Sequence, residues 1–277
     1  MRLRHIIATC LLLAALFGAR PAAAGLPRRQ GRVVVLRPHR AGLAGASEIW
    51  VYRPPGRDSA ALPVLYYLHG NPGLPSDLFH AGLKSIMDRY IARGGRPFVV
   101  AAPDGNSSRH FDTEWGDASD GTDFVESFLL DRVIPMVEGR YPRDASRRAI
   151  AGFSMGGFGA MNIALQRPDL FGQIVSVAGY FSLDDPNHVF ATAQSQLLNS
   201  PSANISGARG KRILLLEDRD ERLAAVRGQS ARFDAGLATA GIPAALYVAR
   251  GGHDVAYEIR QLSVIQHFLA IGWAAIA

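Results

Sequence analysis

Cysteine is almost absent from this sequence of 277 residues, which contains only Cys10. Cys10 lies in an apolar run from Ile6 to Phe17, between a basic start and the small residues at 22–24. This pattern is typical of a signal peptide that is cleaved before Gly25. The mature chain would then have no cysteine and no disulfide, so its stability would have to come from a hydrophobic core.

Apolar runs long enough to span a bilayer are also lacking. The run from Ile6 to Phe17 is short for a transmembrane helix, and Arg20 and Pro21 interrupt the sequence that follows it. We therefore predict a secreted or periplasmic protein that makes no stable membrane insertion after removal of residues 1–24. A retained membrane anchor is the alternative.

The sequence carries little excess of one charge. The formal net charge of +6 falls to +3 without residues 1–24. Removal of Arg2, Arg4 and Arg20 leaves 27 basic residues against 24 acidic ones. The arginines are scattered, and we expect no nucleic-acid partner. The 48% hydrophobic content suits a single globular domain over residues 25–277. Nothing in the sequence indicates the oligomeric state.

From Pro63 onward, apolar runs alternate with amphipathic segments, as in βα units. Predicted strands cover Arg32–Leu36, Glu48–Tyr52, Val64–Leu68, Phe98–Ala101, Arg148–Ala151, Ile174–Ala178, Ile213–Leu216 and Ala244–Ala249. Predicted helices cover Phe79–Arg93, Asp123–Glu138, Gly157–Gln166, Gln229–Ala240 and Tyr257–Ile271. We expect an α/β fold, with a mostly parallel sheet, helices on both faces and an antiparallel edge formed by the first two strands.

Asp123 is placed to cap the predicted helix Asp123–Glu138, with Glu126 three residues later as in a capping box.

The polar stretch 184–210 is predicted to be an insertion or lid over the site. The alternative is an ordinary surface connection with a short helix near Phe190 to Leu198.

The segment Gly152-Phe153-Ser154-Met155-Gly156 lies between a predicted strand and a predicted helix. This is the context of a nucleophile elbow, in which glycines allow strand and helix to converge. Ser154 would stand exposed above the sheet, with the helix N-terminus and the Met155 N–H directed at a forming oxyanion. The motif alone is weakly specific, because serine also caps helices.

A serine nucleophile needs a neutral imidazole to accept its proton. His253 follows the strand Ala244–Ala249 and precedes the last helix, so it is expected at the carboxyl edge of the sheet. His110 lies in a loop after an earlier strand and could contact substrate.

An acid must orient the imidazole, and the strand Ile213–Leu216 runs directly into a carboxylate-rich loop, 217–221. Asp220 is favoured, because it lies far enough beyond the strand to turn toward the histidine. Asp218 lies close to the strand end and Glu221 is placed to begin a helix, but both stay open. A merely solvated loop is the further alternative.

A second oxyanion donor is expected after the strand Val64–Leu68, where the chain reads His69-Gly70-Asn71-Pro72-Gly73. The Asn71 N–H is the candidate, because Gly70 allows close approach to a ligand and Pro72 has no N–H. His69 is expected to be architectural.

These motifs resemble the putative esterase family of α/β-hydrolases. They are the His69-Gly70 loop, the elbow extended to Gly157, the segment Arg167-Pro168-Asp169-Leu170-Phe171 and Gly252-His253. The family includes esterase D (S-formylglutathione hydrolase), feruloyl and acetyl-xylan esterases, enterochelin-esterase-like proteins and mycolyltransferases. The resemblance covers roughly Val33 to Ala270.

The resemblance implies an α/β-hydrolase fold and a catalytic triad of Ser154, Asp220 and His253. It also implies an oxyanion hole formed by the backbone N–H groups of Asn71 and Met155. The stretch Glu114-Trp115-Gly116-Asp117 and Asp120 resembles a Trp-containing acidic segment of the family. Trp115 and Asp120, with His110, are therefore candidate substrate-binding residues, although a structural loop with a packed Trp is equally compatible.

The implied activity is that of an exported serine esterase, acting through an acyl-enzyme on a small-molecule, glycan or lipid ester without metal or cofactor. One alternative is an acyltransferase of the mycolyltransferase type, in which a sugar or lipid hydroxyl replaces water. Another is a non-catalytic binding protein on the same fold, which the ordered serine, acid and histidine disfavour. The sequence does not indicate the acyl length or the alcohol.

Overall fold

The computed structural model describes residues 30–38, 47–56, 62–183 and 188–275. The predicted signal peptide lies outside the described residues, as do residues 184–187 of the predicted lid. Among the helices of the described ranges, none combines the length and apolar character needed to cross a bilayer.

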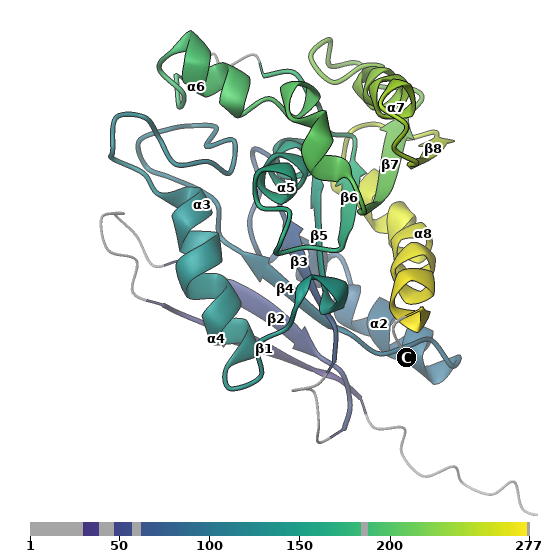
Figure 1. The fold of residues 1–277 in the computed structure, drawn as a ribbon. Helices are drawn as coiled ribbons and strands as arrows, with labels where there is room; N and C mark the ends of the chain where they lie inside the picture. Colours follow the sequence, from purple (N-terminus) through teal and green to yellow (C-terminus); the bar gives the residue numbers. More distant parts are fainter. Residues whose placement is uncertain (1–29, 39–46, 57–61, 184–187, 276–277) are drawn as a thin grey trace, which may run out of the picture.

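A single eight-stranded sheet forms the centre of the molecule, in the order β1-β2-β4-β3-β5-β6-β7-β8 (Figure 1). The pairs β1–β2 and β2–β4 are antiparallel, whereas all other pairs are parallel. This confirms the predicted mostly parallel sheet with an antiparallel edge. The strands are β1 (Arg32–Leu36), β2 (Ile49–Arg53), β3 (Val64–Leu68), β4 (Val99–Pro103), β5 (Arg148–Phe153), β6 (Gln173–Val177), β7 (Arg212–Asp218) and β8 (Ala245–Ala249).

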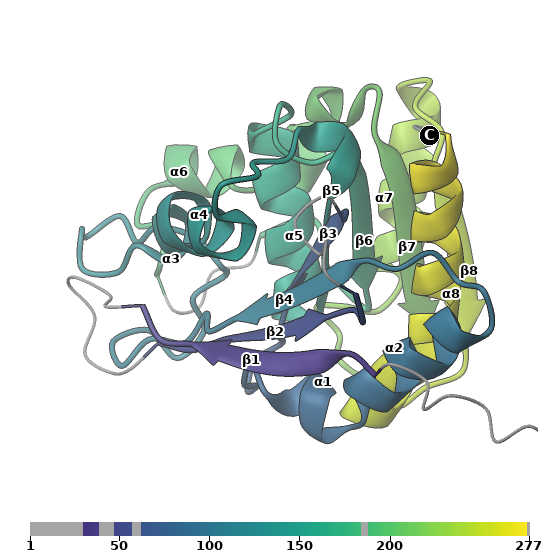
Figure 2. The ribbon, with the colours of Figure 1, turned by 90° about the horizontal axis from the view of Figure 1, so that it is seen from below.

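Helices cover both faces of the sheet (Figure 2). One face packs against α3 (Val125–Phe128), α4 (Ile134–Glu138), α5 (Met155–Gln166) and α7 (Gln229–Thr239). The other packs against α1 (Asp77–His80), α2 (Leu83–Ala92) and α8 (Val255–Ala274). Because side chains alternate along a strand, Tyr66 and Ile150 join the first core, and Leu65 and Ala149 join the second.

Two predicted helices differ from the observed ones. The predicted helix 79–93 is divided into α1 and α2 at Gly82, whose φ of 102° cannot continue a right-handed helix. The predicted helix 123–138 begins at Val125 and passes through a π-helical segment, Leu129–Val133, into α4. The capping-box prediction is wrong, because the Asp123 carboxylate contacts the loop that carries His110 instead.

The described part of the polar stretch, 188–210, contains α6 (Ala193–Leu198), at the position of the short helix that belongs to the surface-connection alternative. Two 3₁₀ turns follow it, Pro201–Ala203 and Ile205–Ala208. A Cβ at Gly207 would lie 2.1 Å from the Leu165 carbonyl oxygen, so this part is closely packed on α5. A lid function stays a prediction.

The sheet register places the two predicted catalytic loops side by side. Strands β3 and β5 pair from Val64 opposite Arg148 to Leu68 opposite Gly152. The loop after β3 and the turn after β5 therefore leave the same edge of the sheet next to each other.

Candidate active site

Ser154 occupies the turn between β5 and α5, with φ 53° and ψ −118°, a conformation that non-glycine residues rarely adopt. Two glycines make this turn possible. A Cβ at Gly152 would lie 2.1 Å from the Gly156 carbonyl oxygen, and one at Gly156 would lie 2.1 Å from that of Leu68. The Ser154 N–H donates to the Val177 carbonyl oxygen at 2.9 Å. The turn thus has the local geometry expected of a nucleophile elbow.

His253 lies beside this serine, in the loop between β8 and α8. Its Nε2 atom is 2.8 Å from Ser154 Oγ, and its ring packs on Phe153 with 4.8 Å between ring centroids. The next residue, Asp254, caps α8 by accepting the Tyr257 N–H at 2.7 Å. The loop that presents the imidazole is therefore fixed where it enters the helix.

Glu221, and not the predicted Asp220, faces the imidazole. The Glu221 Oε2 atom is 2.5 Å from His253 Nδ1, and its side chain is 2% exposed. Its Oε1 atom accepts the Leu223 N–H at 2.8 Å. Asp220 is exposed. The prediction of Asp220 is wrong because no helix begins at Glu221; α7 begins only at Gln229, and the intervening turns direct Glu221 back toward the sheet edge.

This hydrogen-bond order defines the protonation that the site requires. An imidazole that donates its Nδ1–H to Glu221 leaves Nε2 as an acceptor for the Ser154 hydroxyl. The arrangement can therefore deprotonate the serine.

Asp218, the other alternative acid, supports the backbone of the site. Its Oδ1 accepts the Asp220 N–H at 2.9 Å, and its Oδ2 accepts the His253 N–H at 3.1 Å. His253 has a φ of 50°. By binding the main chain of His253, Asp218 thus holds this strained residue in place.

Residues His69–Gly73, which carry the predicted oxyanion donor Asn71 and are called the oxyanion loop below, lie against the elbow. A Cβ at Gly70 would come within 3.3 Å of Ser154 Cβ. In the buried His69 ring, Nδ1 lies 2.8 Å from the Gly70 carbonyl oxygen. Nε2 accepts a hydrogen bond from the Gly105 N–H at 3.0 Å. Burial lowers the pKa of His69, and the neutral Nδ1–H form satisfies both contacts. His69 therefore has the architectural role predicted for it.

Trp115 was a predicted substrate-binding residue, but it is fully buried. Its Nε1–H donates to the His69 carbonyl oxygen at 3.0 Å, and a Cβ at Gly159 would lie 2.4 Å from Trp115 Cβ. The substrate-binding prediction is wrong for this residue, because its indole fills the space between the loop and α5. The packed-Trp alternative is correct.

The other two candidate substrate-binding residues lie together. His110 Nδ1 is 2.7 Å from an oxygen of Asp123, which is 1% exposed. Asp120 is exposed, and its carboxylate lies 3.9 Å from His110 Nε2. For His110 and Asp120, contact with a substrate stays a prediction.

A buried carboxylate near the elbow, Glu114, belongs to the Trp-containing stretch noted in the sequence but was not itself a candidate site residue. Glu114 is 3% exposed and accepts a hydrogen bond from the Tyr180 hydroxyl. The Tyr180 ring stacks on Phe158, one turn after Ser154 in α5, with 4.9 Å between ring centroids. No sequence signal separates Glu114 from its acidic neighbours.

A small pocket of about 40 Å³ lies between the oxyanion loop and the start of α8. Its lining includes Pro72, Leu74, Val255 and Glu258. Burial raises the pKa of Glu258 to about 7, with a smaller contribution from the Asp77 carboxylate. Among the described side chains, no group of three or more His, Cys, Asp or Glu is placed to hold a metal ion.

Residues 42–269 match the family model described as Putative esterase. The chain belongs to this esterase family. The match covers most of the chain and includes the elbow, the oxyanion loop, Glu221 and His253. Family membership confirms the predicted resemblance, and it makes this protein a carboxylic-ester hydrolase of the serine type.

Solved esterase structures share its fold. A ferulic acid esterase is 25% identical, with a TM-score of 0.76 over 88% of this chain and 99% of that one. S-formylglutathione hydrolase from Agrobacterium tumefaciens is 19% identical, with a TM-score of 0.72 over 88% and 96%. A ferulic acid esterase from Anaeromyces mucronatus, in complex with ferulic acid, is 17% identical, with a TM-score of 0.66 over 92% and 94%. The α/β-hydrolase fold of this esterase is thus confirmed.

Proposed function

We propose that this esterase acts through a covalent acyl-enzyme on Ser154. The observation that supports this proposal is the hydrogen-bonded chain from Ser154 Oγ through His253 to Glu221, with distances of 2.8 and 2.5 Å. A serine so connected to a neutral imidazole and a buried carboxylate is activated as a nucleophile.

In this mechanism, Ser154 Oγ attacks the ester carbonyl carbon while His253 Nε2 takes its proton. Glu221 stabilises the resulting imidazolium. His253 then returns the proton to the leaving alcohol as the C–O bond of the ester breaks. A water molecule, deprotonated by His253, then attacks the acyl carbon. The bond from the acyl carbon to Ser154 Oγ breaks as His253 passes the proton to Oγ, which releases the acid and restores Ser154.

The backbone N–H groups of Met155 and Asn71 are the proposed oxyanion donors. Met155 is the first residue of α5, where N–H groups have no partner within the helix and the helix dipole favours negative charge. Asn71 directly follows Gly70, which lies against Ser154. Two such donors would stabilise the tetrahedral intermediate.

The proposed substrates are small-molecule, glycan or lipid esters. Since one structural neighbour is a ferulic acid esterase, esters of phenolic acids form the first class to test. The proposal includes export to the periplasm or the medium, which rests on the pattern of residues 1–24.

Hydrolysis of p-nitrophenyl esters from acetyl to palmitoyl, and of methyl ferulate, tests the proposal in the wild type and in Ser154→Ala. We expect kcat to fall by about 10⁶ in the variant, because the serine is the nucleophile. Ser263→Ala, at an exposed position of α8, is the matched control and should retain wild-type kcat.

Two other results would change the assignment. An inactive wild type, or a Ser154→Ala variant as active as the wild type, would contradict the serine mechanism and favour a binding protein on the same fold. Acyl transfer to an added sugar in preference to water would favour an acyltransferase of the mycolyltransferase type.

A further inference from the structure

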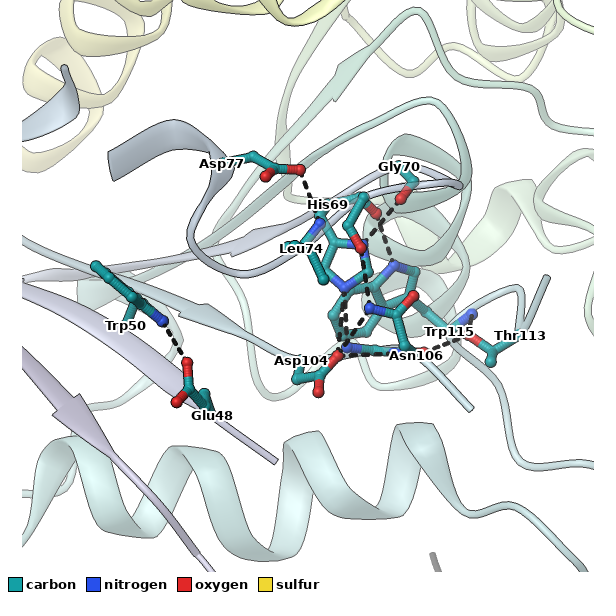
Figure 3. A network of polar contacts seen from close by, with 12 residues as sticks. Glu48, Trp50, His69, Gly70, Leu74, Asp77, Asp104, Asn106, Thr113 and Trp115 are labelled. Carbon is teal, nitrogen blue, oxygen red and sulfur yellow. Dashed lines mark hydrogen bonds and ion pairs between the residues drawn. The ribbon is translucent and has the colours of Figure 1, made fainter. Parts of the chain in front are cut away.

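Residues 104–115, called the clamp segment below, follow β4. Figure 3 shows Asn106 and Trp115 of this segment beside His69 of the oxyanion loop. Hydrogen bonds join the two segments. They include Gly105 N–H to His69 Nε2 at 3.0 Å, Trp115 Nε1–H to the His69 carbonyl oxygen at 3.0 Å, Asn71 Nδ2–H to Asp112 Oδ2 at 3.3 Å, and Asn106 Nδ2–H to the Gly73 carbonyl oxygen at 2.9 Å. The first, middle and last residues of the loop are therefore all held.

The oxyanion loop has an irregular, tightly curled backbone between β3 and α1. A Cβ at Gly73 would lie 2.5 Å from the Gly70 carbonyl oxygen. A displacement of Gly73 would therefore be transmitted to Gly70, and Gly70 lies against Ser154. The position of the Asn71 N–H relative to the serine thus depends on where the end of the loop is held.

The clamp segment is itself braced. The Thr113 hydroxyl donates to the Gly105 carbonyl oxygen at 2.8 Å, which closes the segment on itself. Asp104 Oδ1 accepts from both the backbone N–H and the Nδ2 of Asn106, at 3.1 and 3.0 Å. The Asn106 amide group thus donates to Asp104 and to Gly73, which fixes its orientation.

We propose that Asn106 is a positioning residue for the oxyanion donor and acts through the Gly73 carbonyl oxygen. This inference rests on the proposed function, because it concerns the N–H group of Asn71 in the ester-cleaving step. Asn106 is not proposed to contact the substrate. It acts by keeping the loop at the distance from Ser154 at which the Asn71 N–H meets the oxyanion.

The test is Asn106→Ala, assayed for ester hydrolysis. We expect kcat to fall about tenfold while KM changes less than about twofold, because the displaced donor is needed in the transition state more than in substrate binding. Gln229→Ala is the matched control. Its Nε2 also donates to a backbone carbonyl oxygen, that of Ala225 at 3.1 Å, but at the start of α7 and outside the predicted lid. It should leave kcat unchanged.

A second measurement does not depend on activity. The Trp115 indole N–H is bonded to the same loop and is one of three in the protein, so its NMR signal can be assigned with Trp115→Phe. Hydrogen exchange at this group should be at least about tenfold faster in Asn106→Ala than in the wild type or Gln229→Ala, because a loosened loop opens more often.

Unchanged exchange or unchanged kcat in Asn106→Ala would overturn the positioning role. A rise in KM at constant kcat would also overturn it and would indicate a substrate-binding role instead. If the wild type hydrolysed no ester, the proposed function would fail, whereas the exchange measurement would still decide whether Asn106 holds the loop.

Discussion

Replacing Glu221 by glutamine tests the structural assignment of the acid with almost no change in shape. Both carboxylate oxygens accept hydrogen bonds, Oε2 from His253 Nδ1 and Oε1 from the Leu223 N–H. A glutamine has a single acceptor oxygen, so its NH₂ group must face one of these two donors. If it faces His253, the imidazole must turn to the tautomer that has a proton on Nε2, and that tautomer cannot accept the Ser154 proton.

The expected loss of kcat is that seen when a buried acid of a catalytic triad is removed. Glu221 is 2% exposed at the side chain, so water cannot replace the lost acceptor. Removal of the acid in serine proteases lowers kcat by about 10⁴, which corresponds to about 5 kcal/mol of transition-state stabilisation. We expect Glu221→Gln to lower kcat by about 10³ to 10⁴ with p-nitrophenyl acetate, measured from initial rates at saturating substrate.

Two neighbouring carboxylates supply controls for this experiment. Asp220→Asn should retain kcat within about twofold, because the side chain is exposed and only its N–H is bonded to Asp218. Asp218→Asn should have an intermediate effect, of about 10- to 100-fold, because Asp218 holds the His253 backbone. A large loss in Asp220→Asn with none in Glu221→Gln would refute the reasoning and restore the assignment made from sequence.

Two further predictions concern buried carboxyl groups. Burial raises the pKa of Glu258 from 4.5 to about 7, so the folded protein keeps a proton that the unfolded chain releases, and stability should fall as pH rises through this range. Urea unfolding at pH 4.5 and 8 measures this change in unfolding free energy, and Glu258→Gln should reduce it by at most about 3 kcal/mol. The same change in the variant as in the wild type would contradict the raised pKa of Glu258. Glu138 binds Arg148 through two hydrogen bonds of 2.7 and 2.9 Å and accepts from the Tyr66 hydroxyl, so Glu138→Ala should cost about 3 to 5 kcal/mol of unfolding free energy. The kcat of Glu138→Ala should stay within about twofold of the wild-type value, because Arg148 lies at the start of β5, about 20 Å before Ser154. A loss of kcat without a loss of stability would contradict a purely structural role for Glu138.

Much of the fold could be predicted because the strands are short apolar runs. Strands β1 and β3 begin and end where the sequence predicted, and the others differ by one or two residues. Ser154 and His253 were also placed correctly, because the glycine spacing of the elbow and the position of the histidine after a strand are local features. Each depends on a few adjacent residues.

The acid could not be chosen from sequence, because the choice depends on the path of a turn. Residues 217–221 hold four carboxylates, and which of them meets the imidazole depends on how far the chain turns before α7. Asp218 contributes to that turn through its own hydrogen bond to the Asp220 N–H. The burial of Glu221 and the exposure of Asp220 therefore depend on tertiary structure.

The roles of Trp115 and Asp123 depended on contacts far along the chain. Trp115 bonds to His69, which is 46 residues away in sequence, and its burial follows from the absence of a side chain at Gly159. Asp123 looked like a helix cap, but its carboxylate is used by His110. In both cases a long-range contact outweighed a local sequence preference.

The most direct test of the central claim is to trap the acyl-enzyme. Mixing the wild type with p-nitrophenyl trimethylacetate, whose bulky acyl group slows deacylation, and quenching in acid should give a protein heavier by one acyl group. Peptide mapping should locate that group on Ser154, and Ser154→Ala should acquire none. An ester that is turned over with no acyl group on Ser154, or with the group on another residue, would contradict the account.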